Sequence, residues 1–188
     1  MKNLKEFLNK PLLKHSKAID FLTKNNSVKT KDIPVAVSKT KEVNYSALTC
    51  KNKIKLFIPL KPTEQQLKEI PIILLHEYLH LCIDQNKNLT SIMKALIEEN
   101  KSFFKKFSYA KFSSWIILHE LIASSFIPEG YLGQKMGYNI NYREKTRLGK
   151  TRLLIGKKMY SLAKKYIDKK IPIDKKYISK ILKVLDKN

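Results

Sequence analysis

The chain has few cysteines, glycines and arginines, and it lacks a long uninterrupted apolar run. Two cysteines among 188 residues provide no disulfide framework. Only five glycines occur, and no internal repeat, low-complexity linker or glycine-rich phosphate-binding motif is present. The longest apolar run is interrupted by His76, Glu77 and His80, so we expect no transmembrane helix. No apolar stretch follows the N-terminal lysines, so we expect no secretory signal peptide and a cytoplasmic location.

Acidic residues are also scarce, with 16 Asp and Glu against 38 Lys and Arg, which gives a formal charge of +22. A field of this sign attracts nucleic acid, anionic membranes and acidic proteins. The lysines are spread along the chain, however, and no zinc-finger or RNA-recognition motif is present. This pattern favours dispersed solubilising charge over specific nucleic-acid binding, and it leaves nonspecific binding to nucleic acid or another anionic surface as a candidate interaction. An apolar content of 43% is typical of a folded globule.

The segment from Leu74 to Leu81 contains the pattern H-E-x-x-H inside an apolar stretch. Histidines four positions apart lie on one face of a helix, so the imidazoles of His76 and His80 can reach the same divalent ion. Glu77 lies next to the first histidine and can deprotonate a metal-activated water. Burying two imidazoles and a carboxylate among apolar neighbours is costly unless a metal ion compensates them. The pattern therefore predicts a zinc hydrolase rather than a core helix with two satisfied histidines.

A hydrolytic zinc ion usually takes three protein ligands and leaves one position for water. The metzincin continuation would require a glycine at 83 and a histidine or aspartate at 86, but this chain has Ile83 and Asn86. A glutamate on a later helix is the other common third ligand. Glu120 is the preferred candidate because nearly all of its neighbours from Trp115 to Phe126 are apolar or small. Glu98 and Glu99 remain alternatives, although they lie in a polar helical stretch typical of a surface.

Four further residues are candidates for supporting roles. His119 could replace Glu120 as a ligand, or it could act as a second-shell or transition-state group. Ser124, one turn after Glu120, could accept the outer N–H of a liganding histidine. The hydroxyl of Tyr131 or Tyr138 could stabilise an oxyanion. Ordinary packing remains the competing interpretation for His119 and for both tyrosines.

With these residues the chain resembles the gluzincin metallopeptidases, the thermolysin-like clan, and its short length resembles the compact minigluzincins. The resemblance covers roughly residues 44–126. It implies that His76, His80 and Glu120 bind zinc, that Glu77 is the general base, and that the reaction is peptide-bond hydrolysis. The substrate would be a peptide or protein, with a preference that the resemblance does not specify.

The remaining patterns predict an α+β, mostly helical single domain over residues 1–188. Helical spacing occupies Leu4 to Lys24, divided near Pro11, and strands are predicted near residues 33–37, 43–49 and 53–58. This small sheet should pack on the H-E-x-x-H helix, whose predicted N-cap is Thr63. We place a catalytic core at about residues 30–140 and a basic helical extension at about 142–188. Other predicted features are a loop at 84–88, a cap at Thr90 or Ser91, a cap at Ser113 or Ser114, and a cap at Asp174.

Three functional hypotheses follow from these patterns. The first is a zinc-dependent metallopeptidase that uses a zinc-activated water and Glu77. The second is a non-catalytic, basic nucleic-acid- or membrane-binding protein on a metallopeptidase-like scaffold. The third is a latent peptidase in which the chain after Tyr142 covers the cleft.

Overall fold

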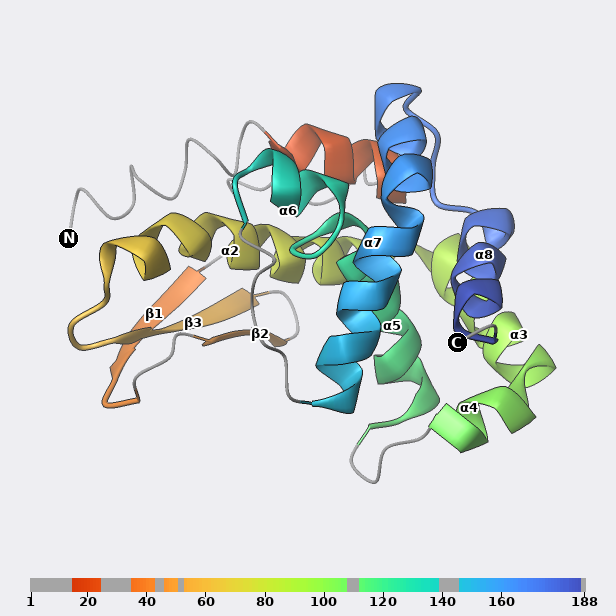
Figure 1. Ribbon diagram of the computed structural model, residues 1–188, viewed down its shortest axis with the longest axis horizontal. Helices are drawn as coiled ribbons and strands as arrows, with labels where there is room; N and C mark the ends of the chain where they lie inside the picture. Colours follow the sequence, from red (N-terminus) through yellow and green to blue (C-terminus); the bar gives the residue numbers. More distant parts are fainter. Residues whose placement is uncertain are drawn as a thin grey trace.

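The computed structural model describes residues 15–24, 35–42, 46–50, 53–107, 112–138 and 146–186. Within these residues the protein has the predicted α+β, mostly helical single-domain fold. A small sheet lies along one side of a long helix. Most of the later helices gather around the C-terminal end of that helix (Figure 1). Of the helical stretch predicted around Pro11, only residues 15–24 fall within the described residues, and 15–23 of these are helical.

The sheet contains β1 (Val35–Thr40), β2 (Ser46–Cys50) and β3 (Lys53–Pro59), close to the three predicted strands. β3 lies in the centre, parallel to β1 and antiparallel to β2. Lysine and apolar residues alternate at the start of β3, and as predicted one face of the strand is buried while the other is partly exposed to solvent. The buried residues of β3 are Ile54, Leu56 and Ile58 on one face and Pro59 at its end.

The helix that carries the H-E-x-x-H pattern is α2 (Glu64–Gln85), and it is capped as predicted. The Thr63 hydroxyl accepts a hydrogen bond from the Gln66 N–H at 3.2 Å, and the Gln66 side-chain oxygen accepts one from the Thr63 N–H at 2.9 Å. Pro71 lies inside this helix. From Ile70 onward nearly every residue is buried, since α2 is apolar on all faces and packs between the sheet and other helices.

The predicted loop at 84–88 is much shorter than expected, and the predicted cap at Thr90 or Ser91 is wrong. α2 continues to Gln85, and α3 (Lys87–Glu99) starts directly after Asn86. The Asn86 side chain accepts from the Leu89 N–H at 2.9 Å, so one asparagine both ends α2 and caps α3. α3 ends at its C-cap Asn100, and α4 (Lys101–Phe107) follows directly.

α5 (Ser114–Phe126) carries Glu120 and starts at the predicted cap Ser113, whose hydroxyl accepts from the Ile116 N–H at 3.3 Å. The short helix α6 (Tyr131–Lys135) follows a turn through Pro128 and Gly130. A Cβ atom at Gly130 would lie 2.0 Å from the Ser125 carbonyl oxygen. This turn therefore needs glycine to fold back on the end of α5.

The basic tail forms α7 (Arg147–Asp168) and α8 (Lys175–Asp186), and Asp174 caps α8 by accepting from the Tyr177 N–H at 2.8 Å. α7 packs along α5, and α8 packs on α3 and α5. At Gly156 an added Cβ would lie 2.6 Å from the backbone of Glu129, so the glycine lets α7 approach the turn after α5. The tail therefore shares the hydrophobic core with the preceding helices.

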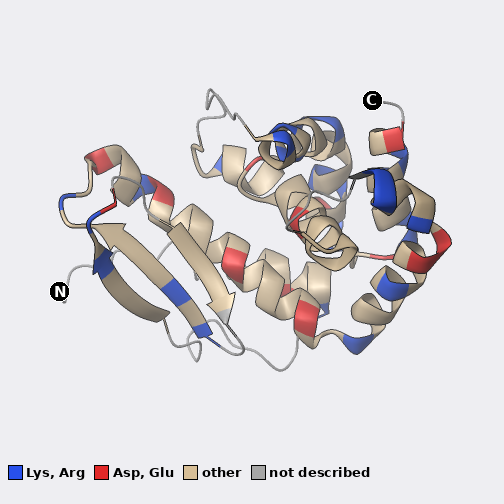
Figure 2. Cartoon of the chain, turned by 90° about the horizontal axis from the view of Figure 1, so that it is seen from below, with Lys and Arg blue, Asp and Glu red and all other residues tan. Residues whose placement is uncertain are grey.

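Lys and Arg residues are scattered over the strands and helices of the described chain, as their distribution in the sequence predicts (Figure 2). Acidic residues are fewer and are interspersed among them. Among the described residues, every helix is too short or too polar to cross a bilayer.

Candidate metal centre

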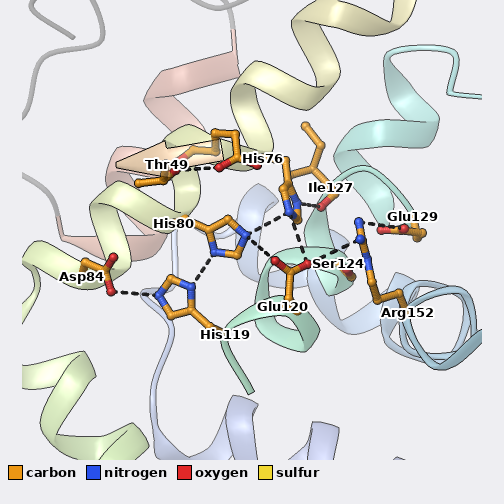
Figure 3. Close-up of polar contacts among 11 residues, drawn as sticks. Thr49, His76, His80, Asp84, His119, Glu120, Ser124, Ile127, Glu129 and Arg152 are labelled. Carbon is orange, nitrogen blue, oxygen red and sulfur yellow. Dashed lines mark hydrogen bonds and ion pairs between the residues drawn. The ribbon is translucent and has the colours of Figure 1, made fainter. Parts of the chain in front are cut away.

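Two helices bring three potential metal ligands together. His76 and His80 come from α2, and Glu120 comes from α5 (Figure 3). The two Nε2 atoms are 2.9 Å apart. The Glu120 carboxylate lies 3.5 Å from His76 Nε2 and 3.3 Å from His80 Nε2. Within the described part of the chain, these residues form a metal-competent group whose ligand atoms all lie within 4.8 Å of one another.

The outer nitrogen of His76 determines which of its ring nitrogens can bind a metal. His76 Nδ1 lies 2.8 Å from the carbonyl oxygen of Ile127, just after α5. A carbonyl oxygen can only accept, so Nδ1 carries the hydrogen and the neutral ring presents a lone pair at Nε2. Metal-binding histidines commonly donate their second N–H to a backbone carbonyl in this way.

His80 is oriented by side chains instead of by the backbone. Its Nδ1 lies 2.5 Å from Nδ1 of His119, and His119 Nε2 lies 3.2 Å from the Asp84 carboxylate. His80 and His119 are both nearly buried, with 6% and 7% of their surface exposed. The Nε2 atoms of His76 and His80 point at one another and at Glu120, so the site presents two imidazole nitrogens and one carboxylate to a common point.

This donor set fits a divalent metal ion. Two nitrogen lone pairs and a carboxylate repel one another unless a cation lies among them. Without a metal, the raised pKa of His76 favours a proton on that ring, and a metal ion would displace the proton. Two imidazoles and one carboxylate suit zinc among the common biological metals, and they leave further coordination positions open.

The pKa directions agree with one shared positive charge. Burial lowers the pKa of His76, but the hydrogen bond and charge of Glu120 outweigh burial and raise it above its usual value. Burial and then the neighbouring His76 lower the pKa of His80 to about 4. Burial opposes ionisation of Glu120, yet its contacts with His76 and His80 hold its pKa well below the usual range. His80 is therefore neutral and Glu120 is ionised at pH 7.

A cationic side chain from the C-terminal tail lies on the other side of Glu120. Arg152 on α7 places a guanidinium nitrogen 3.5 Å from Glu120 and another 3.0 Å from Glu129. Its Nε donates to the Ser124 hydroxyl at 2.8 Å. Burial lowers the pKa of Arg152, but Glu129 and Glu120 outweigh burial and raise it, so the guanidinium stays charged. Arg152 thus joins the third candidate ligand to the turn after α5.

Glu77, the candidate general base, is 8% exposed and lies on the side of α2 that faces the sheet. The Thr49 hydroxyl on β2 lies 2.7 Å from Glu77 Oε2 and 3.1 Å from the Glu77 carbonyl oxygen. A hydroxyl donates one hydrogen, so these are alternative or shared hydrogen bonds. Thr49 therefore ties an edge strand of the sheet to the candidate base.

The other candidates occupy different places. Ser124 accepts from Arg152, while both outer histidine nitrogens have other partners. Tyr131 packs edge-on against Tyr160 with ring centroids 5.4 Å apart, consistent with the packing interpretation. Tyr138 is half-buried, and its electrostatic interaction with Arg152 helps to raise the pKa of that guanidinium.

The two alternative third ligands lie away from this group. Glu98 pairs with Lys101, and Glu99 accepts from Lys175 at 2.8 Å on the surface. Both carboxylates are therefore engaged in exposed ion pairs. Of the acidic candidates, Glu120 is the one that the fold brings to the histidines.

Sequence reasoning did not identify Asp84, Arg152, Glu129 or Thr49. Asp84 had a usable signal, because it follows His80 by the same four-residue step that separates the two histidines. Arg152 had a weaker one, since it is one of three arginines among 38 basic residues and arginine is favoured for pairing with buried carboxylates. Glu129 and Thr49 depend on contacts between distant elements and carry no local signal.

Comparisons of the chain with protein-family models, with curated proteins and with solved structures find no match. The function must therefore be inferred from the chemistry of the site.

Proposed function

We propose that the protein is a zinc-dependent metallopeptidase of the gluzincin type, with His76, His80 and Glu120 as the metal ligands. The observation that carries the proposal is the convergence of two buried imidazole nitrogens and a carboxylate from two separate helices. The outer Nδ1 of each histidine has a partner of its own, and both Nε2 atoms lie beside Glu120.

When bound at such a site, zinc lowers the pKa of a water molecule and polarises a carbonyl group. The chain supplies the remaining functions. The Glu77 carboxylate follows His76 directly in α2 and would accept a proton from that water and deliver it to the leaving amine. Thr49 would hold this carboxylate in place through the hydroxyl 2.7 Å from Oε2.

A peptide is the favoured substrate because an edge strand lies beside the candidate base. Among the described residues, β2 pairs with β3 alone, so one edge of β2 is open to pairing. An extended peptide can add to such an edge through backbone hydrogen bonds, which hold the substrate largely independently of its side chains. The contact between Thr49 and Glu77 links this edge to the site.

The first test measures bound metal. Purified wild-type protein, His76→Ala and Glu120→Ala should be dialysed against zinc and then against metal-free buffer, followed by elemental analysis. We expect about one zinc per wild-type chain, as one site of this kind holds one ion, and much less in both variants. Glu98→Gln is the matched control, because Glu98 pairs with Lys101 on the surface and its loss should leave zinc content unchanged. Wild-type protein free of zinc would refute the proposal.

The second test measures hydrolysis. A mixture of peptides with diverse sequences should be incubated with wild type and Glu77→Gln, and the products identified by mass spectrometry. We expect cleavage by wild type that a chelator abolishes, and zinc-loaded but inactive Glu77→Gln. Zinc binding without cleavage of any peptide would reject the peptidase and retain the metal site. Normal cleavage by Glu77→Gln would reject the role of Glu77.

A further inference from the structure

The candidate metal centre continues outward from His80 through two more side chains. His119 lies on α5 next to Glu120, and Asp84 lies on α2 one turn after His80. The rings of His80 and His119 are nearly parallel, at 13°, with centroids 4.5 Å apart. Their Nδ1 atoms are only 2.5 Å apart, closer than stacked planes approach, which is roughly 3.5 Å. The rings therefore meet edge to edge, the orientation of a hydrogen bond between nitrogens (Figure 3).

The hydrogen atoms along this chain can be assigned from its far end. The Asp84 carboxylate lies 3.2 Å from His119 Nε2 without the geometry of a hydrogen bond, but its negative charge disfavours a lone pair on Nε2 and favours a hydrogen there. A neutral His119 then has its lone pair at Nδ1. The His80 Nδ1 must then donate to His119, which leaves the lone pair of His80 at Nε2. The opposite arrangement would put a hydrogen on His80 Nε2, and that nitrogen could not bind a metal.

We propose that Asp84 and His119 are positioning residues that together hold His80 in the metal-binding tautomer and ring orientation. Where it concerns a metal, this inference rests on the proposed function. The indole of Trp115 lies over the His119 ring, at 5.8 Å between centroids and 29° between planes, and restricts the ring further. Asp84 is half exposed, and its contact with the site is the one that it makes with the buried His119 among the described residues.

The two histidine ligands differ in a way that makes this inference testable. His76 is oriented by a backbone carbonyl, which side-chain substitution does not remove, whereas His80 depends on two replaceable side chains. Removing Asp84 or His119 should therefore disturb the orientation of His80 and leave that of His76 unchanged. Because Asp84 lies near the C-terminal end of α2, where a negative charge is unfavourable, its removal should not destabilise the helix.

The first experiment measures zinc affinity by competition with a chromophoric chelator, using zinc ion alone as the ligand. We expect Asp84→Ala and His119→Phe each to weaken binding by about 10- to 100-fold, the usual effect of removing a partner of a metal-binding histidine. The double variant should bind no more weakly than His119→Phe, because Asp84 acts through His119. His119→Gln should recover affinity, since its amide oxygen can accept from His80. Asp168→Ala removes an aspartate from the end of α7 and is the matched control.

The second experiment reads the tautomers directly, without metal and without activity. Nitrogen NMR of the imidazoles at neutral pH should show hydrogen on Nδ1 of His80 and on Nε2 of His119. Hydrogen on Nε2 of His80, or wild-type zinc affinity in both Asp84→Ala and His119→Phe, would overturn the inference. If His119→Phe fails to fold, Asp84→Ala and His119→Gln decide the affinity test. Wild-type protein that binds no zinc would refute the proposed function, and the tautomers would still decide this inference.

Discussion

Replacing Arg152 with methionine should destabilise the metal-free protein substantially. The methionine side chain keeps much of the apolar stem of arginine but removes the guanidinium that contacts Ser124, Glu129 and Glu120. The Glu129 carboxylate is 7% exposed and its Oε2 already lacks a hydrogen bond within the described structure. Without Arg152 this buried carboxylate would lose the ion-pair partner that lies 3.0 Å away.

The magnitude follows from the burial of the partners. Removing one partner of a buried ion pair costs about 3–5 kcal/mol. The side chain of Arg152 is 24% exposed, so partial solvent access favours the lower end, about 3 kcal/mol. At about 2–4 °C per kcal/mol for a chain of this length, the melting temperature should fall by roughly 6–12 °C.

The assay is urea and thermal unfolding followed by circular dichroism, in the presence of a chelator so that metal binding does not contribute. Lys68→Met is the control, because Lys68 and Glu64 form an exposed pair with 63% and 84% of their side chains accessible. That variant should lose no more than about 0.5 kcal/mol. Adding Glu129→Gln to Arg152→Met should restore part of the loss. Equal stabilities for Arg152→Met and Lys68→Met would refute the reasoning.

Three further predictions concern the same region. Gly156→Ala should lower the unfolding free energy measured in urea, because its Cβ would lie 2.6 Å from the Glu129 backbone and would push α7 away. This displacement costs about 1–3 kcal/mol, whereas the gain in helix propensity offsets at most ~1 kcal/mol. Unchanged stability would contradict this packing. The pKa of His80 is lowered to about 4, so its contribution to stability is present above pH 6.5 and is lost between pH 6.5 and 4; His80→Gln should flatten this part of a stability–pH curve. Thr49→Val should lower kcat with little change in zinc affinity, because Thr49 contacts Glu77 rather than a ligand; wild-type kcat would argue against a role for that hydroxyl.

In the hypothesis of a latent enzyme, the tail after Tyr142 covers the cleft. Within this tail α7 supplies Arg152, which contacts Glu120, and Gly156, which packs on the turn after α5. Truncating the tail would therefore remove a partner of a candidate ligand and part of the core. Point variants on α7 test its role more cleanly than deletion does.

Much of the local structure could be predicted from short stretches of sequence, because caps and periodic burial depend on neighbours along the chain. Thr63, Ser113 and Asp174 cap their helices as expected, and β3 buries alternate residues. The prediction failed at Asn86, where one residue both ends a helix and caps the next. Thr90 and Ser91 have good capping side chains, but α3 begins at Lys87, so both residues lie inside its first turns.

The sequence by itself determined which groups lie close together along the chain: two candidate metal ligands and a carboxylate on one helix, and a second carboxylate in an apolar helix. Tertiary packing alone decided that Glu120 meets His76 and His80, that His119 connects His80 to Asp84, and that Arg152 lies against Glu120. The physical reason is that helical periodicity specifies which face of a helix is apolar, whereas the register between two helices depends on how all their side chains pack together.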